Sequence, residues 1–183
     1  LEHINDGREN TVEAKEIAPW GKLLKSSQFW SLGLQFMITD YIMYVFLAWL
    51  PLYLMEVHGF SLSKMGLWAA APWLSLMAVV SCCGYLSDKA IAAGFSQNLV
   101  KTSTGAVGIL LCACTLFIAT RTADPMMNVF WLSVALGSLG LTMSASWSSV
   151  ISMGGRFAGS VSGWMNFWGN IGGVLAPSVT AWV

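Results

Sequence analysis

The sequence predicts an all-α membrane protein with five transmembrane helices, and three observations support this prediction. Of its 183 residues, 56% are hydrophobic and only 10% are charged, whereas soluble domains ordinarily carry about 25% charged residues. The apolar residues are gathered into long runs, and a helix that crosses a bilayer needs roughly 20 of them. Short polar or turn-rich segments, such as EVHGFSL and RTADPMM, separate the runs.

Five runs are long enough to span a membrane, and they are residues 29–55, 63–86, 102–120, 128–152 and 157–182. The first run contains Pro51, which lacks an N–H group, so we expect a bend near its far end. The second has Pro72 at its centre. The third has no charge, amide or proline, so we expect it to face lipid. The fourth and fifth are rich in glycine, serine and asparagine.

The positive charges favour one side of the membrane. With loops numbered from the N-terminus, the odd-numbered side holds seven of the nine cationic residues: Arg8, Lys15, Lys22, Lys25, Lys89, Lys101 and Arg156. The even-numbered side holds Lys64 and Arg121. Because cytoplasmic loops carry the excess of Lys and Arg, we expect a multi-pass protein of the plasma (inner) membrane with a cytoplasmic N-terminus.

Composition argues against several classes of function. The net charge is zero, which gives no reason to expect nucleic-acid binding. Four cysteines lie in apolar runs without zinc-ligand spacing to His3 or His58, so we expect small buried hydrophobes and neither a metal site nor a cofactor: Cys82, Cys83, Cys112 and Cys114. The sequence contains no catalytic constellation, so we do not expect an enzyme.

The fifth expected span has two different faces. One carries a stripe of small and polar residues at intervals of three and four, which places them on one side of a helix: Gly159, Gly163, Asn166, Asn170, Gly173 and Pro177. The opposite side carries bulky residues that we expect to face lipid: Val161, Trp164, Trp168, Ile171 and Leu175. Glycines on such a stripe favour close helix packing. The two asparagines fit either packing or a water-filled substrate cavity.

Asp40 is the only acidic residue that falls inside an expected span. A carboxylate at the centre of a membrane helix costs about 2.5–3.5 kcal/mol to insert. Asp40 therefore either faces a wet interior and handles substrate or protons, or is held neutral within a packed bundle. Tyr44 lies one turn further along the same face, and we expect it to be able to donate a hydrogen bond to Asp40.

Polar side chains from three helices fall at one depth. Ser144 of the fourth span, Asn166 of the fifth and Asp40 of the first lie within about 6 Å of the middle of their helices, on the same side. Serines in membrane helices often bond only to their own backbone, so each alone is weak evidence. The coincidence in depth favours a binding site near the midplane and argues against a purely structural bundle.

Four stretches resemble the C-terminal half of a major facilitator superfamily transporter, and most closely its anion:cation symporter family: YVFLAWLPLYL (44–54), GYLSDK (84–89), GGRFAG (154–159) and SGWMNFWGNIGGVLAP (162–177). The resemblance implies that the five spans are helices seven to eleven of that fold. Residues 1–26 would be the cytoplasmic linker between the two halves, and residues 27–183 the C-terminal half, truncated before its last helix. The opening Leu1 and the apolar end fit an internal piece of a longer protein.

The resemblance also implies roles for individual residues. Ser144, Ser146 and Trp147 stand where helix ten contacts the substrate, and Asn166 stands where helix eleven does. Tyr44 and Asn170 complete the expected substrate-binding set. At the cytoplasmic side, Asp88 is expected to tether a helix N-terminus, against the simpler alternative of a solvated loop acid.

Together with Asp88, Arg156 would form the cytoplasmic gate. Three departures from the family pattern stand out. Relatives often place a glutamine at or near Phe36, which we expect this chain to lack. Asp40 stands where some relatives have a neutral polar residue, and the acidic residue often found before Arg156 is missing.

The sequence therefore predicts part of a secondary transporter for a small organic anion, such as a sugar acid or another carboxylate. We expect proton or sodium symport by alternating access around a midplane site, with the lipid bilayer and a missing N-terminal half as partners. A transporter of neutral solutes in the same superfamily remains an alternative. A polytopic membrane enzyme is a weaker one.

Overall fold

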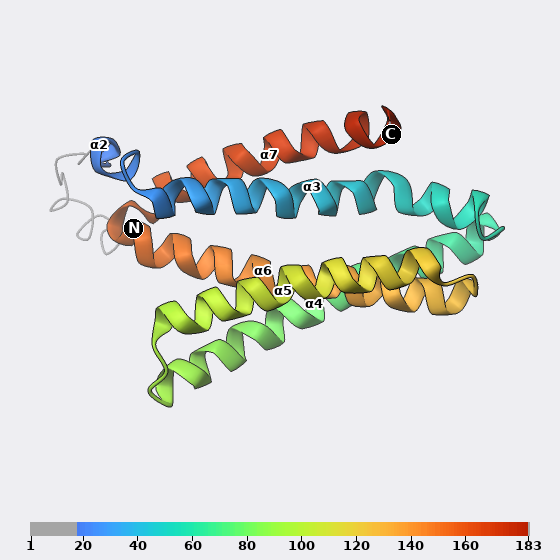
Figure 1. Ribbon diagram of the computed structural model, residues 1–183, viewed down its shortest axis with the longest axis horizontal. Coiled ribbons are helices and arrows are strands. Elements are labelled where there is room, and N and C mark those ends of the chain that lie inside the picture. The colour runs from blue at the N-terminus through green and yellow to red at the C-terminus, as the bar shows by residue number, and fades with distance from the viewer. Residues whose placement is uncertain (1–17, 183) are drawn as a thin grey trace, which may run out of the picture.

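The computed structural model describes residues 18–182, and these form a bundle of long helices (Figure 1). A short helix α2 (Trp20–Leu23) precedes the bundle. The five long helices are α3 (Ser27–Glu56), α4 (Leu62–Ala92), α5 (Gln97–Arg121), α6 (Pro125–Gly154) and α7 (Ala158–Trp182), and a 3₁₀ turn, η1 (Gly155–Phe157), separates the last two. The expected linker, residues 1–26, falls mostly outside the described residues.

The five expected spans coincide with the five long helices. Segments Ser27–Glu56, Leu62–Ala92, Gln97–Arg121 and Pro125–Trp182 are each long and apolar enough to cross a membrane, and η1 divides the last of them into α6 and α7. The predicted all-α membrane fold is confirmed. Two boundaries differ: α4 continues through the SDK segment that we expected to be a loop, and α5 begins at Gln97, five residues before the expected span.

The turns between helices are short because their sequences stop a helix efficiently. Gly59, Gly94 and Gly155 have positive φ values of 64°, 98° and 49°, which glycine adopts without a steric penalty. Asp124 caps α6 by accepting a hydrogen bond of 2.8 Å from the Met127 N–H, and a proline follows it in the first turn. The chain therefore reverses direction within a few residues at each turn.

The helices form two groups. Helix α7 packs along α3, while α6 packs against both α4 and α5. Figure 1 shows α3 and α7 side by side, with α4, α5 and α6 gathered in a second layer. Fewer contacts join the two layers, and they run mainly from α6 to α3 and α7. The inner surface of α6 is therefore the place where polar groups from both layers can meet.

The face that α7 turns toward α3 is not the face we expected. Val161 and Met165 are fully buried in a cluster with Phe29, Leu32 and Phe36 of α3 and Val150 of α6. The expectation that Val161 faces lipid is therefore wrong. Trp164 is also drawn inward, since it stacks on Phe29 with ring centroids 4.8 Å apart.

Close approach of α7 to α3 depends on Gly172, one step around the helix from the predicted stripe, and on Gly173 within it. A Cβ added at Gly172 would collide with the Met37 carbonyl oxygen, and one at Gly173 would lie 2.9 Å from the Tyr44 ring. By contrast, a Cβ added at Gly159 or Gly163 would meet nothing within 4 Å. Of the predicted glycine stripe, only Gly173 serves as a packing seam.

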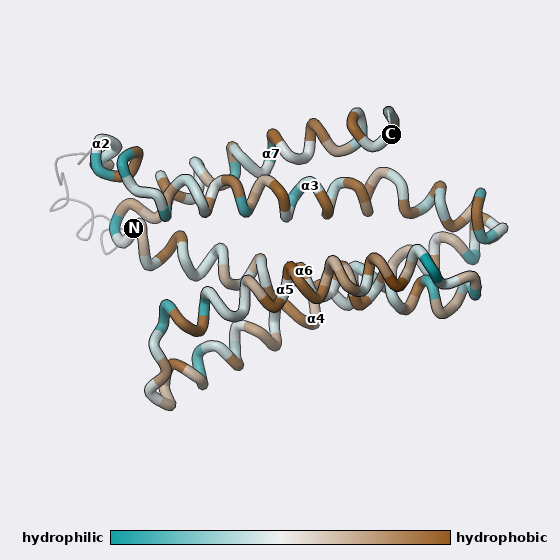
Figure 2. The backbone as a smooth tube through the Cα atoms, viewed as in Figure 1, coloured by the Kyte–Doolittle hydropathy of each residue, from teal (hydrophilic) through white to brown (hydrophobic). Residues whose placement is uncertain are grey.

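Cationic residues mark the two ends of the bundle. We call the end with α2, the α4–α5 turn and η1 the near end, and the end with the α3–α4 and α5–α6 turns the far end. Figure 2 shows apolar helix bodies with hydrophilic residues mainly toward these ends. Four cations each lie over an aromatic ring there, as expected at membrane–water boundaries: Lys89 over Tyr85 and Arg156 over Phe157 at the near end, Lys64 over Phe60 and Arg121 over Phe117 at the far end.

Candidate functional site

A side-chain bridge crosses between the two helix layers. The Nε2 amide of Gln35 on α3 lies 3.0 Å from the hydroxyl of Ser146 on α6, and the Ser146 hydroxyl donates to the Thr142 carbonyl at 2.8 Å. Ser146 is only 1% exposed. The same hydroxyl lies 3.3 Å from the Gln35 Oε1, so its single proton goes either to the Thr142 carbonyl or to Gln35. When it goes to Thr142, the Gln35 Oε1 can accept a hydrogen bond from a bound molecule.

Gln35 supplies the amide that the sequence analysis treated as missing. The family pattern places a glutamine at or near Phe36. Gln35, the residue immediately before Phe36, extends its amide to Ser146 of α6. The expectation that the chain lacks this group is wrong, because a shift of one residue along α3 turns the side chain toward α6. The neighbouring Gln could have been found by allowing that shift.

Phe36 and Trp147 lie beside this bridge. Their rings meet edge to face, with centroids 6.1 Å apart. Phe36 is 2% exposed, while Trp147 is 39% exposed and keeps much of its indole free. Trp147, a predicted substrate-binding residue, therefore lies next to Ser146 with an aromatic surface available.

Asp40 lies one turn further along α3, in the seam with α7. It is 9% exposed, and a Cβ added at Gly169 would collide with its Oδ2 atom. Its Oδ1 is buried and has no hydrogen-bond partner in the described part of the chain. A buried polar atom without a partner is rare and costly, so this position calls for a proton, an ion or a group from another segment.

Tyr44 does not hydrogen-bond to Asp40, contrary to expectation. Its ring packs over Gly173 of α7 instead. The two side chains share a face of α3 but pack against different residues of α7. Gly169 lies against Asp40, and Gly173 lies against Tyr44.

Asn166 and Asn170 lie on an exposed face of α7. Each donates its side-chain amide to the backbone carbonyl four residues earlier, at 3.1 Å to Ser162 and 2.8 Å to Asn166 respectively. No hydrogen bond joins either of them to Ser144 or to Asp40. Their side-chain oxygens remain free to accept hydrogen bonds from outside residues 18–182.

Ser144 and Ser146 lie on different sides of α6. Ser146 faces Gln35, whereas Ser144 makes no side-chain hydrogen bond within the described residues. Gly137 and Gly140, which share the face of Ser144, approach α4 closely: a Cβ at Gly140 would lie 3.1 Å from the Leu76 carbonyl. The structure thus brings Ser146 and Trp147 to the α3 side, whereas Ser144 lies on the face of α6 that also carries Gly137 and Gly140.

Lys101 is a buried charge that sequence analysis placed in a loop. It is 8% exposed, and its Nζ donates to the Ser148 carbonyl at 3.1 Å and to the Ser152 hydroxyl at 2.8 Å. Lys101 is therefore a buried charge-capable side chain in addition to Asp40. The apolar run at residues 102–120 gave no indication that Lys101 is buried, because Lys101 lies just before the run and is buried through contact with α6.

Asp88 and Arg156 both lie at the near end. Asp88 is exposed in the last turns of α4 and makes no hydrogen bond or ion pair with another described residue. Arg156 lies in η1, with its guanidinium 4.9 Å from the centre of the Phe157 ring. The structure leaves Asp88 accessible to a segment outside residues 18–182.

A hydrogen-bond hub joins several helix ends at the far end, and sequence analysis did not identify it. The Tyr53 hydroxyl accepts from the Asn128 amide at 3.1 Å and lies 3.2 Å from His58 Nε2. Asn128 is fully buried and also donates to the Ala119 carbonyl at 2.9 Å. The side-chain NH₂ of Asn128 can only donate. The Tyr53 hydroxyl therefore accepts from it and can use its own proton to donate to His58. This hub ties α3, α5 and α6 together.

Comparison with known protein families identifies the family to which these helices belong. The family model described as Major Facilitator Superfamily matches residues 2–177. No group of three or more His, Cys, Asp or Glu residues within the described chain could hold a metal ion.

Several curated transporters are similar to the chain. A probable sulfoacetate transporter of Cupriavidus necator is 31% identical over 168 residues, which is 91% of this chain and 38% of that protein. A D-galactonate transporter of Escherichia coli O6:H1 is 30% identical over 142 residues, or 77% of this chain and 33% of that protein. A probable L-galactonate transporter of E. coli K12 is 25% identical over 183 residues, or 99% of this chain and 40% of that protein.

The chain thus spans between a quarter and two fifths of the length of such relatives. The matched family model and the transporter relatives agree with the five apolar helices, and they point to a transporter and not to an enzyme. The chain belongs to the major facilitator superfamily of membrane transporters.

Proposed function

We propose that this chain is the C-terminal part of a secondary active transporter for a small organic anion, such as a sugar acid or another carboxylate. The observation that carries the proposal is the Gln35–Ser146 bridge, which sets an amide and a hydroxyl at the junction of two layers of apolar helices. The same helix, α3, buries the partnerless Oδ1 of Asp40. Polar groups at such depth commonly mark substrate pathways. Relatives named for sulfoacetate and galactonate support an anionic substrate.

Substrate recognition would use hydrogen bonds from this chain and a positive charge from elsewhere. Gln35, Ser144 and Ser146 would bond the polar groups of the substrate, Trp147 and Tyr44 would cover its apolar edges, and three of these five already lie together on the inner side of α3 and α6. Asn166 and Asn170 would complete the site from α7. The sole buried cation of the described helices, Lys101, is bonded to the near end of α6. We therefore assign the counter-charge to the missing N-terminal half.

Coupling to a cation would involve Asp40. Its partnerless Oδ1 gives the site a place for a proton, or with further oxygen ligands a sodium ion. Alternating access would expose the site to each side in turn. In this scheme the near end is cytoplasmic, the membrane is the plasma (inner) membrane, and Asp88 and Arg156 belong to the cytoplasmic gate.

The direct test is uptake by the full-length transporter in proteoliposomes. Galactonate, sulfoacetate and other small carboxylates are offered with an imposed proton or sodium gradient, and galactose serves as a neutral control of similar size. Gradient-driven uptake of at least one acid, without uptake of galactose, is expected. Uptake of galactose without any acid would favour the neutral-solute alternative and contradict the proposal.

A further inference from the structure

The hydrogen bonds of the hub at the far end run in one direction. The Asn128 side chain is fully buried, and its Nδ2 donates to the Ala119 carbonyl at 2.9 Å. A carbonyl can only accept, so this contact fixes the orientation of the Asn128 amide. The same Nδ2 donates to the Tyr53 hydroxyl at 3.1 Å, and the proton of Tyr53 is left for the Nε2 of His58, 3.2 Å away. The series of donors therefore ends on a ring nitrogen of His58 that accepts.

His58 can interrupt this series by taking up a proton. A neutral imidazole accepts a hydrogen bond at one nitrogen, whereas both nitrogens of the protonated ring are donors. A protonated His58 would place a second donor against the Tyr53 hydroxyl, and the Tyr53 proton would lose its acceptor. His58 is half-buried in the turn between α3 and α4, so water at the far end can reach it. Histidine is also the side chain that most commonly changes charge between pH 5 and 8.

The charged groups around His58 leave it without an ion-pair partner. Four charged residues lie at this end of the surrounding helices: Glu56 of α3, Lys64 of α4, Arg121 of α5 and Asp124 just before α6. The two cations lie over phenylalanine rings, and the Asp124 carboxylate caps α6. None of the four pairs with His58 within residues 18–182. The His58 ring instead meets the Tyr53 ring edge to face, with centroids 5.1 Å apart. A change in the charge of His58 therefore acts directly on its contact with Tyr53.

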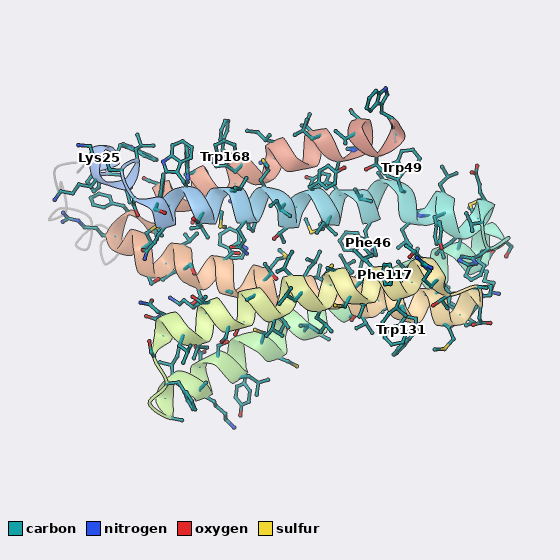
Figure 3. The ribbon with its side chains drawn as sticks, viewed as in Figure 1. Lys25, Phe46, Trp49, Phe117, Trp131 and Trp168 are labelled. Atoms are coloured by element: carbon teal, nitrogen blue, oxygen red, sulfur yellow. The ribbon has the colours of Figure 1, made fainter. Side chains whose placement is uncertain are left out.

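The position of Tyr53 makes this contact a link between the two groups of helices. Tyr53 lies two residues after Pro51, which removes one backbone hydrogen bond from α3, so the last turn is joined less firmly to the rest of the helix. Nearer the middle of α3, apolar side chains such as Phe46 and Leu50 pack on the second layer, and Figure 3 shows Phe46 on that side of α3. The Tyr53 hydroxyl adds a polar attachment to Asn128 of α6. Its loss would free the end of α3 to move relative to the α5–α6 turn.

We propose that His58, Tyr53 and Asn128 form a pH-sensitive latch between the end of α3 and the α5–α6 turn. The latch is complete while His58 is neutral, and it weakens as the pH falls and His58 takes up a proton. In the orientation given under the proposed function the far end faces the outside, so acidification of the outside would favour opening of that side. This last step rests on the proposed function, whereas the latch itself depends only on the hub.

Hydrogen exchange of the full-length transporter at about pH 7.5 and about pH 5.5 tests the latch without any substrate. Exchange times are corrected for the intrinsic effect of pH on amide exchange, and residues 119–130 are compared with residues 101–112 in the near half of α5. His58→Gln keeps an acceptor for the Tyr53 proton but does not titrate. Glu56→Gln removes a neighbouring titratable group instead and is the matched control. Tyr53→Phe removes the link at both pH values and provides a second variant should His58→Gln fold poorly.

In the wild type and in Glu56→Gln, residues 119–130 should exchange about five- to tenfold faster at the lower pH, as expected from loss of one buried hydrogen bond, while residues 101–112 should not change. In His58→Gln the segment should exchange equally slowly at both pH values, and in Tyr53→Phe equally fast. No effect of pH on this segment in the wild type would overturn the proposal. An effect that persists in His58→Gln would overturn it too, because the pH response would then belong to another group. None of these outcomes depends on which solute is transported.

Discussion

The Gln35 amide lies 3.0 Å from the Ser146 hydroxyl, and this contact joins residues 111 positions apart in the sequence. With the Tyr53–Asn128 hydrogen bond at the far end, it is one of two polar links within residues 18–182 between the α3–α7 pair and the α4–α5–α6 group, which share few other contacts. A ligand that engages either partner therefore acts on the relative position of two packed units. Under the proposed function, substrate recognition and conformational change would share this location.

Gly169 should be intolerant of substitution, while Gly163 should be tolerant. The added methyl of Gly169→Ala would collide with Asp40 and would lie 2.9 Å from Phe36. Overpacking of this kind costs about 1–3 kcal/mol. A thermal unfolding experiment in detergent should show a lower Tm for Gly169→Ala. Gly163→Ala, which meets nothing within 4 Å, serves as the control on the same helix, and an equal loss in both variants would contradict the packing described for α7.

Lys101→Glu should destabilise the near end of the bundle. The substitution places a carboxylate against the Ser148 carbonyl, where an ammonium now donates at 3.1 Å. Leaving a buried charge unpaired costs about 3–5 kcal/mol. Lys89→Glu makes the same change in charge at the same end, on an exposed residue, and so controls for effects on membrane orientation. We expect Lys101→Glu alone to lower the yield of folded protein in size-exclusion chromatography; similar yields would refute the buried role.

Tyr53→Phe should loosen the far end. Removing the hydroxyl takes one acceptor from the buried Asn128 amide and the donor from His58. An unsatisfied buried group costs about 1–3 kcal/mol. Hydrogen exchange should become faster in residues 119–130 in Tyr53→Phe. In Tyr85→Phe, where the hydroxyl makes no hydrogen bond to a described residue, exchange of that segment should stay as in the wild type. Unchanged exchange in Tyr53→Phe would show that the hub contributes little.

Asp40→Asn should separate coupling from binding. Asparagine keeps the shape beside Gly169 but cannot load and release a proton. In proteoliposomes, substrate-driven proton movement should be lost, while exchange of labelled for unlabelled substrate should persist. Glu56→Gln, an exposed carboxyl on the same helix, should retain both activities. Proton movement that survives in Asp40→Asn would leave Asp40 with a packing role only.

The sequence was sufficient to predict the five helices, because their apolar runs and turn residues act locally. The faces were predicted less well. Val161 was expected to face lipid, since helical spacing separates two faces but does not say which one meets a neighbour. The glycines Gly169 and Gly172, one step around from the predicted stripe, allow the closest approach to α3.

The substrate contacts of Ser146 and Trp147 stay predictions, and the structure places both residues beside α3. Gln35 was overlooked, and Tyr44 packs on Gly173. The burial of Lys101 and Asn128 depends on contacts with distant segments, which spacing along one helix does not contain. Such groups become visible only when the helices are placed together.

The most direct test of the account is the affinity of the full-length transporter for its carboxylate substrate in Gln35→Leu. Leucine has a similar size but no amide, so both the hydrogen bonds with Ser146 and the amide groups available to a substrate are lost. We predict a dissociation constant at least roughly tenfold higher, measured by isothermal titration calorimetry, with Gln28→Leu in the exposed first turn of α3 binding as the wild type does. Equal affinity of Gln35→Leu and wild type would contradict the claim that the substrate is bound at the junction of α3 and α6.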